Sequence, residues 1–181
     1  MKSSLKLSFL LFLLFIYSCG SGPGHNAVQV PDGKTVILVG TTGFYALREA
    51  PFSDWFDPGY KAFTPDPAHV ETLKPLLEDI DIVVFLGTWC EDSHREIPKF
   101  VKILEATEYP LEAIDVIAMT RDKTTPQDYE AGLDITNIPT LIFYKDGLEL
   151  GRIVEFAVED LESDMIKVLS GQPYKHAYDW D

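Results

Sequence analysis

The sequence contains one cysteine that its surroundings could make reactive. Cys90 follows a run of apolar residues, 82–86, and a short turn, and apolar residues then recur at helical spacing from Ile97 to Leu104. This order places the sulfur at the N-terminus of a helix, where free backbone N–H groups and the helix dipole favour thiolate over thiol. Because a thiolate is the species that attacks a disulfide bond, the pattern predicts thiol–disulfide chemistry at Cys90.

Three neighbouring side chains are expected to modulate this thiolate. His94 lies four residues beyond Cys90 on the predicted helix, within reach of the sulfur, and its imidazolium would stabilise a negative charge. Glu91 and Asp92 act against it, because like charges beside a thiolate disfavour the charged form. We expect a moderate net stabilisation of the thiolate.

The residue three positions after the cysteine decides how the reaction can end. A second thiol there would attack the mixed disulfide and release the substrate, but the position holds Ser93, whose hydroxyl cannot do so. Ser93 can instead hydrogen-bond the thiolate. Cys90 would therefore act as a single catalytic thiol with Ser93 beside it, and a thiol from the substrate, a small molecule or a partner protein would complete the exchange.

Metal binding is a weaker interpretation of the same residues. Cys90, Asp92 and His94 lie on one turn, which is not a usual zinc-ligand spacing, and a fourth ligand is not evident. We expect no metal and no cofactor at this site.

Motifs around and after Cys90 resemble the thioredoxin superfamily. Trp89-Cys90 matches its active-site signature, with Ser93 where the family usually has a second cysteine. The resemblance spans residues 34–171, and the extracytoplasmic thioredoxin-like lipoproteins of bacteria are the most similar group. Three later motifs also match, namely the proline that kinks the active-site helix, the cis-proline loop and the hairpin after it, which are here Pro98, Ile138-Pro139-Thr140 and 143–147.

This resemblance implies an α/β fold, a three-layer α/β/α sandwich with a mixed central sheet. It implies a cis bond before Pro139, which would direct the backbone of Ile138 toward Cys90 for pairing with an extended substrate. Trp89 would shield one side of the sulfur. Val84 stands where thioredoxins have a buried acid that relays protons for the second thiol. The second thiol and this acid are therefore both replaced, by Ser93 and Val84.

The remaining pattern predicts the order of the other elements. Strands are expected from apolar and β-branched runs, and helices from apolar residues at helical spacing. The strands are predicted at 35–40, 82–86, 112–119, 140–144 and 148–154, the helices at 67–79, 93–107 and 158–169, and a short helix or turn at 126–133.

An insert, 41–67, precedes the first core helix and is rich in prolines and aromatic residues. The prolines exclude a long helix, and the aromatic residues exclude disorder. The insert would either cover an edge of the sheet or form a binding surface near Cys90. The C-terminal tail, 172–181, receives no assignment.

The N-terminus is predicted to be a secretory signal that ends at a lipid-attachment site. Two lysines precede a short apolar segment, 7–17, which is typical of a signal sequence and too short to span a bilayer comfortably. Residues 16–20, Ile-Tyr-Ser-Cys-Gly, resemble a bacterial lipobox, which implies cleavage before Cys19 and acylation of its sulfur and amino group. The alternative is an ordinary signal with a chance cysteine. Residues 1–18 would be removed, and 19–33 would form a lipidated, flexible tether.

Composition limits the partners and the location. The chain has two cysteines, so with Cys19 acylated Cys90 is the one remaining thiol and no internal disulfide can form. The formal net charge of −14 becomes −16 when the signal and its two lysines are lost, which excludes nucleic acid as a partner. We expect a monomer held in the cell envelope by its lipid anchor, facing the periplasm, at the outer membrane rather than the inner one.

Two functions from different classes fit these observations. The first is a monothiol thiol–disulfide oxidoreductase or isomerase that acts through Cys90 on protein or small-molecule disulfides. The second is a non-catalytic thioredoxin-like module, anchored to the membrane, that uses the Ile138-Pro139 loop and the insert to hold a partner. Cys90 at a helix terminus favours the first, because a binding module has no need of it.

Overall fold

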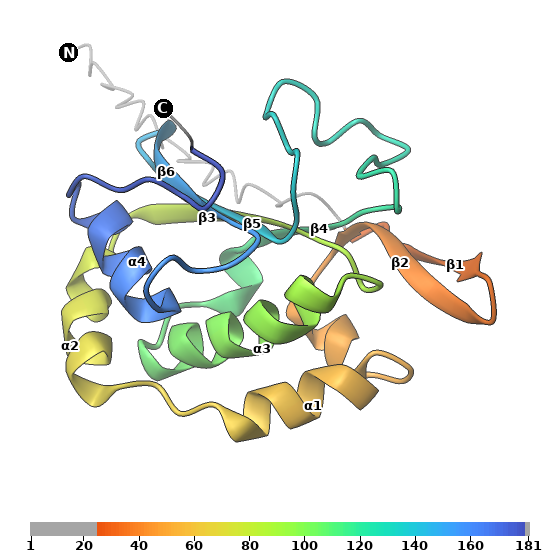
Figure 1. Ribbon diagram of the computed structural model, residues 1–181, viewed down its shortest axis with the longest axis horizontal. Coiled ribbons are helices and arrows are strands. Elements are labelled where there is room, and N and C mark those ends of the chain that lie inside the picture. The colour runs from red at the N-terminus through yellow and green to blue at the C-terminus, as the bar shows by residue number, and fades with distance from the viewer. Residues whose placement is uncertain (1–24, 180–181) are drawn as a thin grey trace, which may run out of the picture.

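The computed structural model describes residues 25–179, and Figure 1 shows their arrangement. The predicted signal sequence, Cys19 and the first part of the tether lie outside this range, so the lipid anchor and the envelope location stay predictions. Within residues 25–179, no helix is both long and apolar enough to cross a membrane.

A six-stranded sheet forms the centre of the described structure (Figure 1). In the order β1-β2-β4-β3-β5-β6, its strands are Val28–Asp32, Thr35–Thr42, Asp115–Ala118, Ile80–Leu86, Thr140–Lys145 and Leu148–Val154. β3 and β4 are parallel, and every other neighbouring pair is antiparallel. The apolar run that predicted a central strand is β3, which lies between β4 and β5 and is largely buried.

Four α-helices and two 3-10 helices accompany the strands within residues 25–179. In chain order, the helices α1 to α4 are Ser53–Ala62, Pro67–Leu76, Glu91–Ala106 and Leu161–Leu169, and the 3-10 helices η1 and η2 are Phe44–Arg48 and Leu111–Ala113. Side-chain caps explain where two of the helices begin. The Asp66 carboxylate accepts the Ala68 N–H at 2.7 Å before α2, and the Asp160 carboxylate accepts the Ser163 N–H at 2.8 Å before α4.

The two faces of the sheet carry cores of different size. In Figure 1 the α-helices lie below the sheet, and a large cluster of buried apolar side chains, including Phe56, Phe100 and Phe143, fills the space between. The segment 120–138 lies above the sheet and covers a smaller cluster, to which Cys90 and Ile138 belong. This segment forms turns, one of the two possibilities predicted for 126–133. The predicted α/β fold with a mixed central sheet is confirmed, and the layer above the sheet in Figure 1 consists of the turns of segment 120–138.

The predicted tether is wrong at its C-terminal end, because Val28–Asp32 forms the edge strand β1. Asp32 pairs with Thr35 across a two-residue turn in which Gly33 has a φ of 63°. Glycine adopts this left-handed conformation without strain. The turn residues that suggested a flexible segment therefore close a β-hairpin.

The insert, 41–67, contains η1 and α1. Pro58 lies inside α1 and removes one backbone hydrogen bond from it. Burial offsets this loss, because α1 packs along α3 and the Phe56 side chain is fully buried in the large core. The insert is thus built into the main core of the domain.

Candidate active site

Cys90 occupies the N-cap position of α3, as the sequence predicted, and the helix begins two residues earlier than expected. The Cys90 carbonyl accepts the His94 N–H at 3.0 Å, and the Cys90 N–H donates to the Gly87 carbonyl at 2.9 Å. Both backbone groups of the cysteine are therefore fixed. The residue is 9% exposed and belongs to the small core cluster.

The loop before β5 faces the sulfur. The Ile138–Pro139 peptide bond is cis, as predicted, and the Cys90 thiol donates to the Ile138 carbonyl at 3.3 Å. The next carbonyl, that of Pro139, accepts the N–H of Glu155 at 2.7 Å. The structure thus brings the predicted pair Ile138 and Cys90 into contact and adds the backbone N–H of Glu155 as a further partner of the same loop.

Ser93 is completely buried beneath the active-site turn. Its hydroxyl oxygen accepts the Gly87 N–H at 3.2 Å, which ties the turn before the cysteine to the first turn of α3. The sequence predicted a hydrogen bond from Ser93 to the sulfur, but the sulfur bonds the Ile138 carbonyl. The crowding also explains Gly87, because a Cβ there would lie 2.7 Å from Ile138 Cδ1 and 2.9 Å from the Trp89 ring.

His94 is held by the turn and the insert. Its Nε2–H donates to the Thr88 carbonyl at 2.9 Å, and its ring stacks on Trp55 with centroids 4.2 Å apart and planes 15° from parallel. We predicted that His94 would approach the sulfur along the helix. The Thr88 carbonyl needs a hydrogen-bond donor, and the Trp55 ring offers a stacking surface. The imidazole of His94 satisfies both, and these two contacts replace the one predicted with the sulfur. The stack also connects the insert directly to the active-site helix.

Two acidic residues belong to the segments that meet at the active-site loop, and the sequence pointed to one of them. Asp92, in the first turn of α3, forms an ion pair with Arg95, whose Nη2 lies 2.6 Å from Oδ1. Glu155 directly follows β6, and its carboxylate accepts a hydrogen bond from the Asn137 side-chain N–H at 3.1 Å. Burial, and next the charge of Asp92, raise the pKa of Glu155 above its ordinary value. Nothing in the sequence links Glu155 to Cys90, because only the fold brings β6 to this helix.

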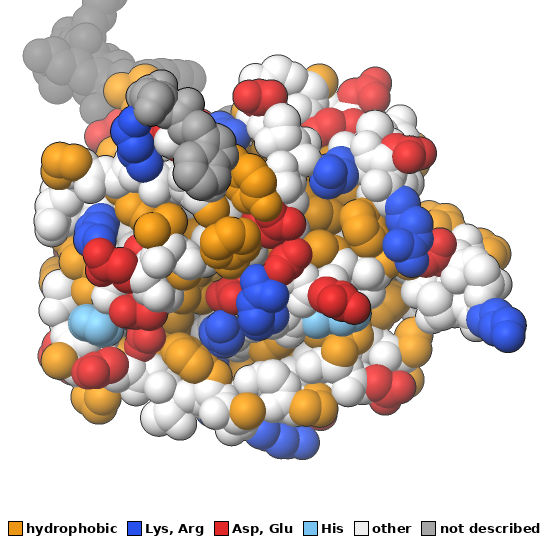
Figure 2. Space-filling view, viewed as in Figure 1, with side chains coloured by type: hydrophobic (Ala, Val, Ile, Leu, Met, Phe, Trp, Pro, Cys, Tyr) orange, Lys and Arg blue, Asp and Glu red, His pale blue; other side chains and the backbone are white. Residues whose placement is uncertain are grey.

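Most other charges around the site are paired. The buried carboxylate of Glu96 accepts hydrogen bonds from Arg95 at 2.8 Å and Lys99 at 3.2 Å, whereas Glu91 is exposed. Figure 2 shows charged side chains of both signs interspersed with apolar ones on the face that it presents. On that face, the negative net charge is not gathered into one patch.

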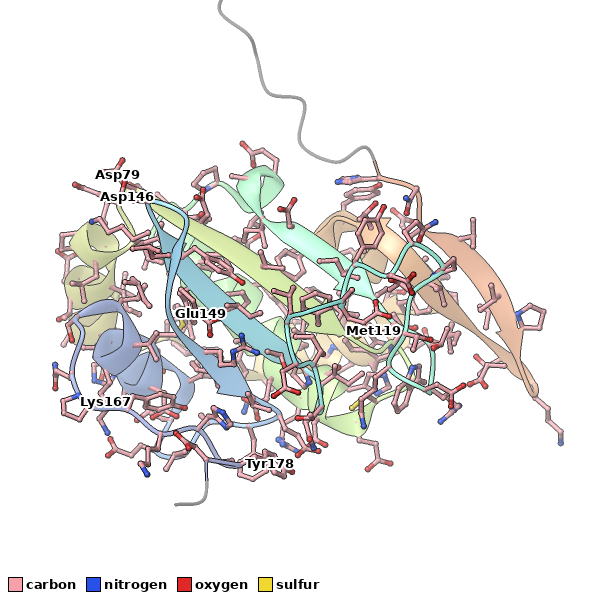
Figure 3. The ribbon with its side chains drawn as sticks, turned by 90° about the horizontal axis from the view of Figure 1, so that it is seen from above. Asp79, Met119, Asp146, Glu149, Lys167 and Tyr178 are labelled. Atoms are coloured by element: carbon pink, nitrogen blue, oxygen red, sulfur yellow. The ribbon has the colours of Figure 1, made fainter. Side chains whose placement is uncertain are left out.

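Trp89 directly precedes the cysteine and contacts residues that follow β4. Its indole N–H donates at 3.0 Å to the carbonyl of Met119, which Figure 3 labels just after β4. The guanidinium carbon of Arg121 lies 5.1 Å from the centroid of the indole, and Arg121 pairs with Asp32 at 2.7 Å. The hydrogen bond from Arg121 lowers the pKa of the Asp32 carboxyl group.

A cavity of about 250 Å³ lies beside this tryptophan. The β1–β2 hairpin, the insert and the active-site turn all contribute to its walls, and the aromatic members are Phe52, Trp55, Trp89 and His94. Aromatic walls suit an apolar side chain of a bound chain. The insert therefore enters the core and also lines a cavity next to the site.

A separate group of possible metal ligands lies where α2 and α4 begin. Ligand atoms of His69, Asp160 and Glu162 all lie within 4.8 Å of one another. The Asp160 and Glu162 carboxylates already accept the backbone N–H groups of Ser163, at 2.8 Å, and Asp66, at 2.7 Å. These bonds stabilise the two helix starts, and within residues 25–179 the buried Nδ1 of His69 has no hydrogen-bond partner.

Two solved structures are similar to this fold at low sequence identity. A search of curated proteins gave no significant match. Among solved structures, a protein of unknown function from Pseudomonas aeruginosa has a TM-score of 0.56 at 14% identity, covering 72% of this chain and 93% of that one. An HIV epitope scaffold has a TM-score of 0.50 at 16% identity, covering 72% and 84%. Mitochondrial thioredoxin 3 from Saccharomyces cerevisiae, in its oxidised form, has a TM-score of 0.32 at 21% identity, covering 53% and 86%.

The family comparison is the more specific one. The sequence profile of the family described as Thioredoxin matches residues 57–165, which is more than half of the chain and includes both Cys90 and the Ile138–Pro139 loop. The chain belongs to the thioredoxin family.

Proposed function

We propose that this protein is a monothiol thiol–disulfide oxidoreductase or isomerase that acts through Cys90. The observation that carries the proposal is the position of the sulfur, at the N-terminus of α3 and 3.3 Å from the Ile138 carbonyl, with Ser93 where a second thiol would stand. A helix terminus favours the thiolate that such chemistry needs. Membership of the thioredoxin family supports a thiol-related function.

The proposed reaction has two steps. The Cys90 thiolate attacks a substrate disulfide, a new S–S bond forms to Cys90, and the other substrate sulfur leaves as a thiolate. Because Ser93 carries no sulfur, a second thiol must then attack the mixed disulfide and expel the Cys90 thiolate. A thiol of the same substrate gives isomerisation, whereas a small thiol or a partner protein gives reduction or deglutathionylation.

The location and the partners are part of the proposal. The lipobox-like residues 16–20 support a lipid anchor at Cys19, which would hold the protein in the cell envelope facing the periplasm. Its substrates would be protein or small-molecule disulfides. We expect the mature chain to begin at an acylated Cys19. Mass spectrometry of the N-terminal peptide from membrane fractions checks this, and an N-terminus at any other residue contradicts it.

A trapping experiment tests the activity. The full chain is treated with hydroxyethyl disulfide at neutral pH, quenched with acid and mapped by peptide mass spectrometry. We expect a mixed disulfide on Cys90 that persists until a thiol such as cysteamine is added. The proposal is wrong if Cys90 of the folded protein gives no adduct while the same residue reacts readily after denaturation.

Ser93→Cys should supply an internal route for release. The introduced thiol would stand three residues after Cys90 in the first turn of α3, so it should expel the substrate and close a disulfide with Cys90. The expected result is loss of the persistent adduct and a gain of insulin reduction with dithiothreitol as the electron source. The control is Ser170→Cys, which places a thiol at the exposed end of α4 and should change neither result. Persistence of the adduct in Ser93→Cys would contradict the proposed geometry.

A non-catalytic binding module is the second candidate, and the aromatic cavity beside Trp89 favours it. Such a module would hold a partner in the cavity and along the Ile138–Pro139 loop without forming a covalent bond. The same trapping experiment separates the two, because a partner that is recovered equally from wild type and Cys90→Ala is held without disulfide exchange.

A further inference from the structure

Three side chains that can bind a metal ion converge where α2 and α4 begin. His69 lies in the first turn of α2, Asp160 is the N-cap residue of α4, and Glu162 lies in the first turn of α4. The two helices pack against each other, at the left of Figure 1. One ligand atom from each of the three residues lies within 4.8 Å of the other two. The group therefore joins two helices and includes no residue of the site around Cys90.

The His69 ring has a nitrogen that can serve as a ligand. Its Nδ1 is buried, and it has no hydrogen-bond partner in the part of the chain that the structure describes. Buried polar atoms in folded proteins are almost always paired, so a free one needs an explanation. An imidazole nitrogen is a common zinc ligand, and an ion held between His69 and the two carboxylates would give this nitrogen a partner.

The hydrogen bonds of the two carboxylates are compatible with a bound ion. Asp160 accepts the Ser163 N–H at 2.8 Å and the Ser163 hydroxyl at 2.7 Å, and Glu162 Oε1 accepts the Asp66 N–H at 2.7 Å. An ionised carboxylate has about four lone-pair sites, so each of the two retains sites for a cation. Hydrogen bonds of this kind orient the ligands of metal ions. The contacts that set the helix starts would therefore also hold the carboxylate oxygens in place.

The spacing and the ligand types favour zinc among divalent ions. Zinc binds nitrogen and oxygen at about 2.0–2.2 Å, so two ligands of one ion lie at most roughly 4.4 Å apart. The limit of 4.8 Å found here is slightly wider, and because Asp160 is exposed, a small rotation of its side chain can close the difference. Magnesium and calcium prefer oxygen ligands, so an imidazole discriminates against them. The positive ends of two helix dipoles oppose a cation, which makes both carboxylates necessary.

We propose that His69, Asp160 and Glu162 bind a zinc ion that connects the first turns of α2 and α4. Three protein ligands leave the fourth position of the tetrahedron to water. Because the ligands come from distant parts of the sequence, the ion would bind the folded chain and stabilise the helical side of the domain. The proposal does not depend on the thiol chemistry of Cys90, so either can fail without the other.

Zinc titration of the full chain tests the site. The chain is freed of metal with EDTA, dialysed and titrated with zinc chloride, with calorimetry for the Kd and thermal unfolding for the stability. At a zinc concentration of a hundred times the Kd, the melting temperature should rise by about 5–10 °C. Magnesium chloride and calcium chloride at the same concentration should leave it unchanged. Because thiolates also bind zinc, the titration is repeated in Cys19→Ala/Cys90→Ala, which has no cysteine and should give the same Kd.

Conservative variants separate metal binding from helix capping. Asp160→Asn and Glu162→Gln keep an oxygen that can accept the same backbone N–H, and His69→Phe keeps an aromatic ring without a ligand atom. Each should weaken zinc binding by at least about a hundredfold, the upper end of the loss from changing an outer partner of a metal site. The melting temperature without metal should change little. Asp66→Asn is the control, because Asp66 caps α2 through the Ala68 N–H at 2.7 Å and is not one of the three ligands, so its zinc affinity should equal that of the wild type.

Three results would overturn the inference. The first is a wild-type chain that zinc does not stabilise, and the second is an equal stabilisation by magnesium. The third is a zinc effect that survives in the ligand variants, which would show adventitious binding elsewhere on the surface. If His69→Phe does not fold, as judged by circular dichroism, the same comparison is made with Asp160→Asn and Glu162→Gln, which keep the capping bonds.

Discussion

Cys90→Ala should abolish adduct formation with disulfides and leave the fold intact. Cys90 is the one free cysteine within residues 25–179, so no other described side chain can take over the attack. The structural cost should be small, about 1 kcal/mol, because alanine fills most of the space of a cysteine in the smaller core. Peptide mapping after treatment with hydroxyethyl disulfide measures the chemistry, and thermal unfolding measures the stability.

The matched variant for this experiment is Ser93→Ala. It removes the hydroxyl that accepts the Gly87 N–H but keeps the single thiol. Adduct formation on Cys90 should survive in this variant, with a loss of stability of about 1–3 kcal/mol because the buried Gly87 N–H loses its acceptor. A Cys90→Ala protein that still forms adducts in the described domain would exclude Cys90 as the nucleophile.

Phe56→Ala should lower the free energy of unfolding by about 3–5 kcal/mol, which is typical of removing a fully buried aromatic ring. The ring is 0% exposed, and it stacks on Tyr60 with centroids 6.0 Å apart. The guanidinium carbon of Arg48 lies 5.3 Å from its centroid. Phe56 belongs to α1 of the insert, so the loss measures how far the insert supports the whole domain. Urea unfolding, followed by circular dichroism, gives the value.

Tyr45→Ala is the control for the size of the deleted ring. Tyr45 is also in the insert but is 60% exposed, and its side chain contacts His25. Its removal should cost less than about 1 kcal/mol, as expected for a surface position. If both substitutions cost equally little, the insert would be a peripheral cover and not a part of the core.

The active-site helix and its loop could be predicted because their signals are local. The apolar spacing from Ile97 to Leu104 placed the start of α3 within two residues, and this put Cys90 at the N-cap. The Ile138-Pro139-Thr140 motif gave the cis bond and the position of the loop. The alternation of strands and helices gave the mixed sheet.

Other features could not be predicted because they depend on contacts between distant segments. Glu155 becomes part of the site only when β6 lies next to the loop at Pro139. His94 contacts Trp55 of the insert, a neighbour that no spacing rule reveals. The prolines of the insert argued against a long helix, but α1 forms ten residues around Pro58 and packs on α3. The glycines and prolines before residue 33 suggested a tether, but Val28–Asp32 forms a strand.

The small core beneath segment 120–138 has a consequence for access. Cys90 belongs to this cluster, while the helices and their large core lie on the opposite face of the sheet. A cover made of turns buries fewer apolar side chains than a packed helix, so lifting it costs less free energy than unfolding the domain. We therefore expect the surroundings of Cys90 to open locally at a lower free energy than the helical side of the molecule, which would stay folded.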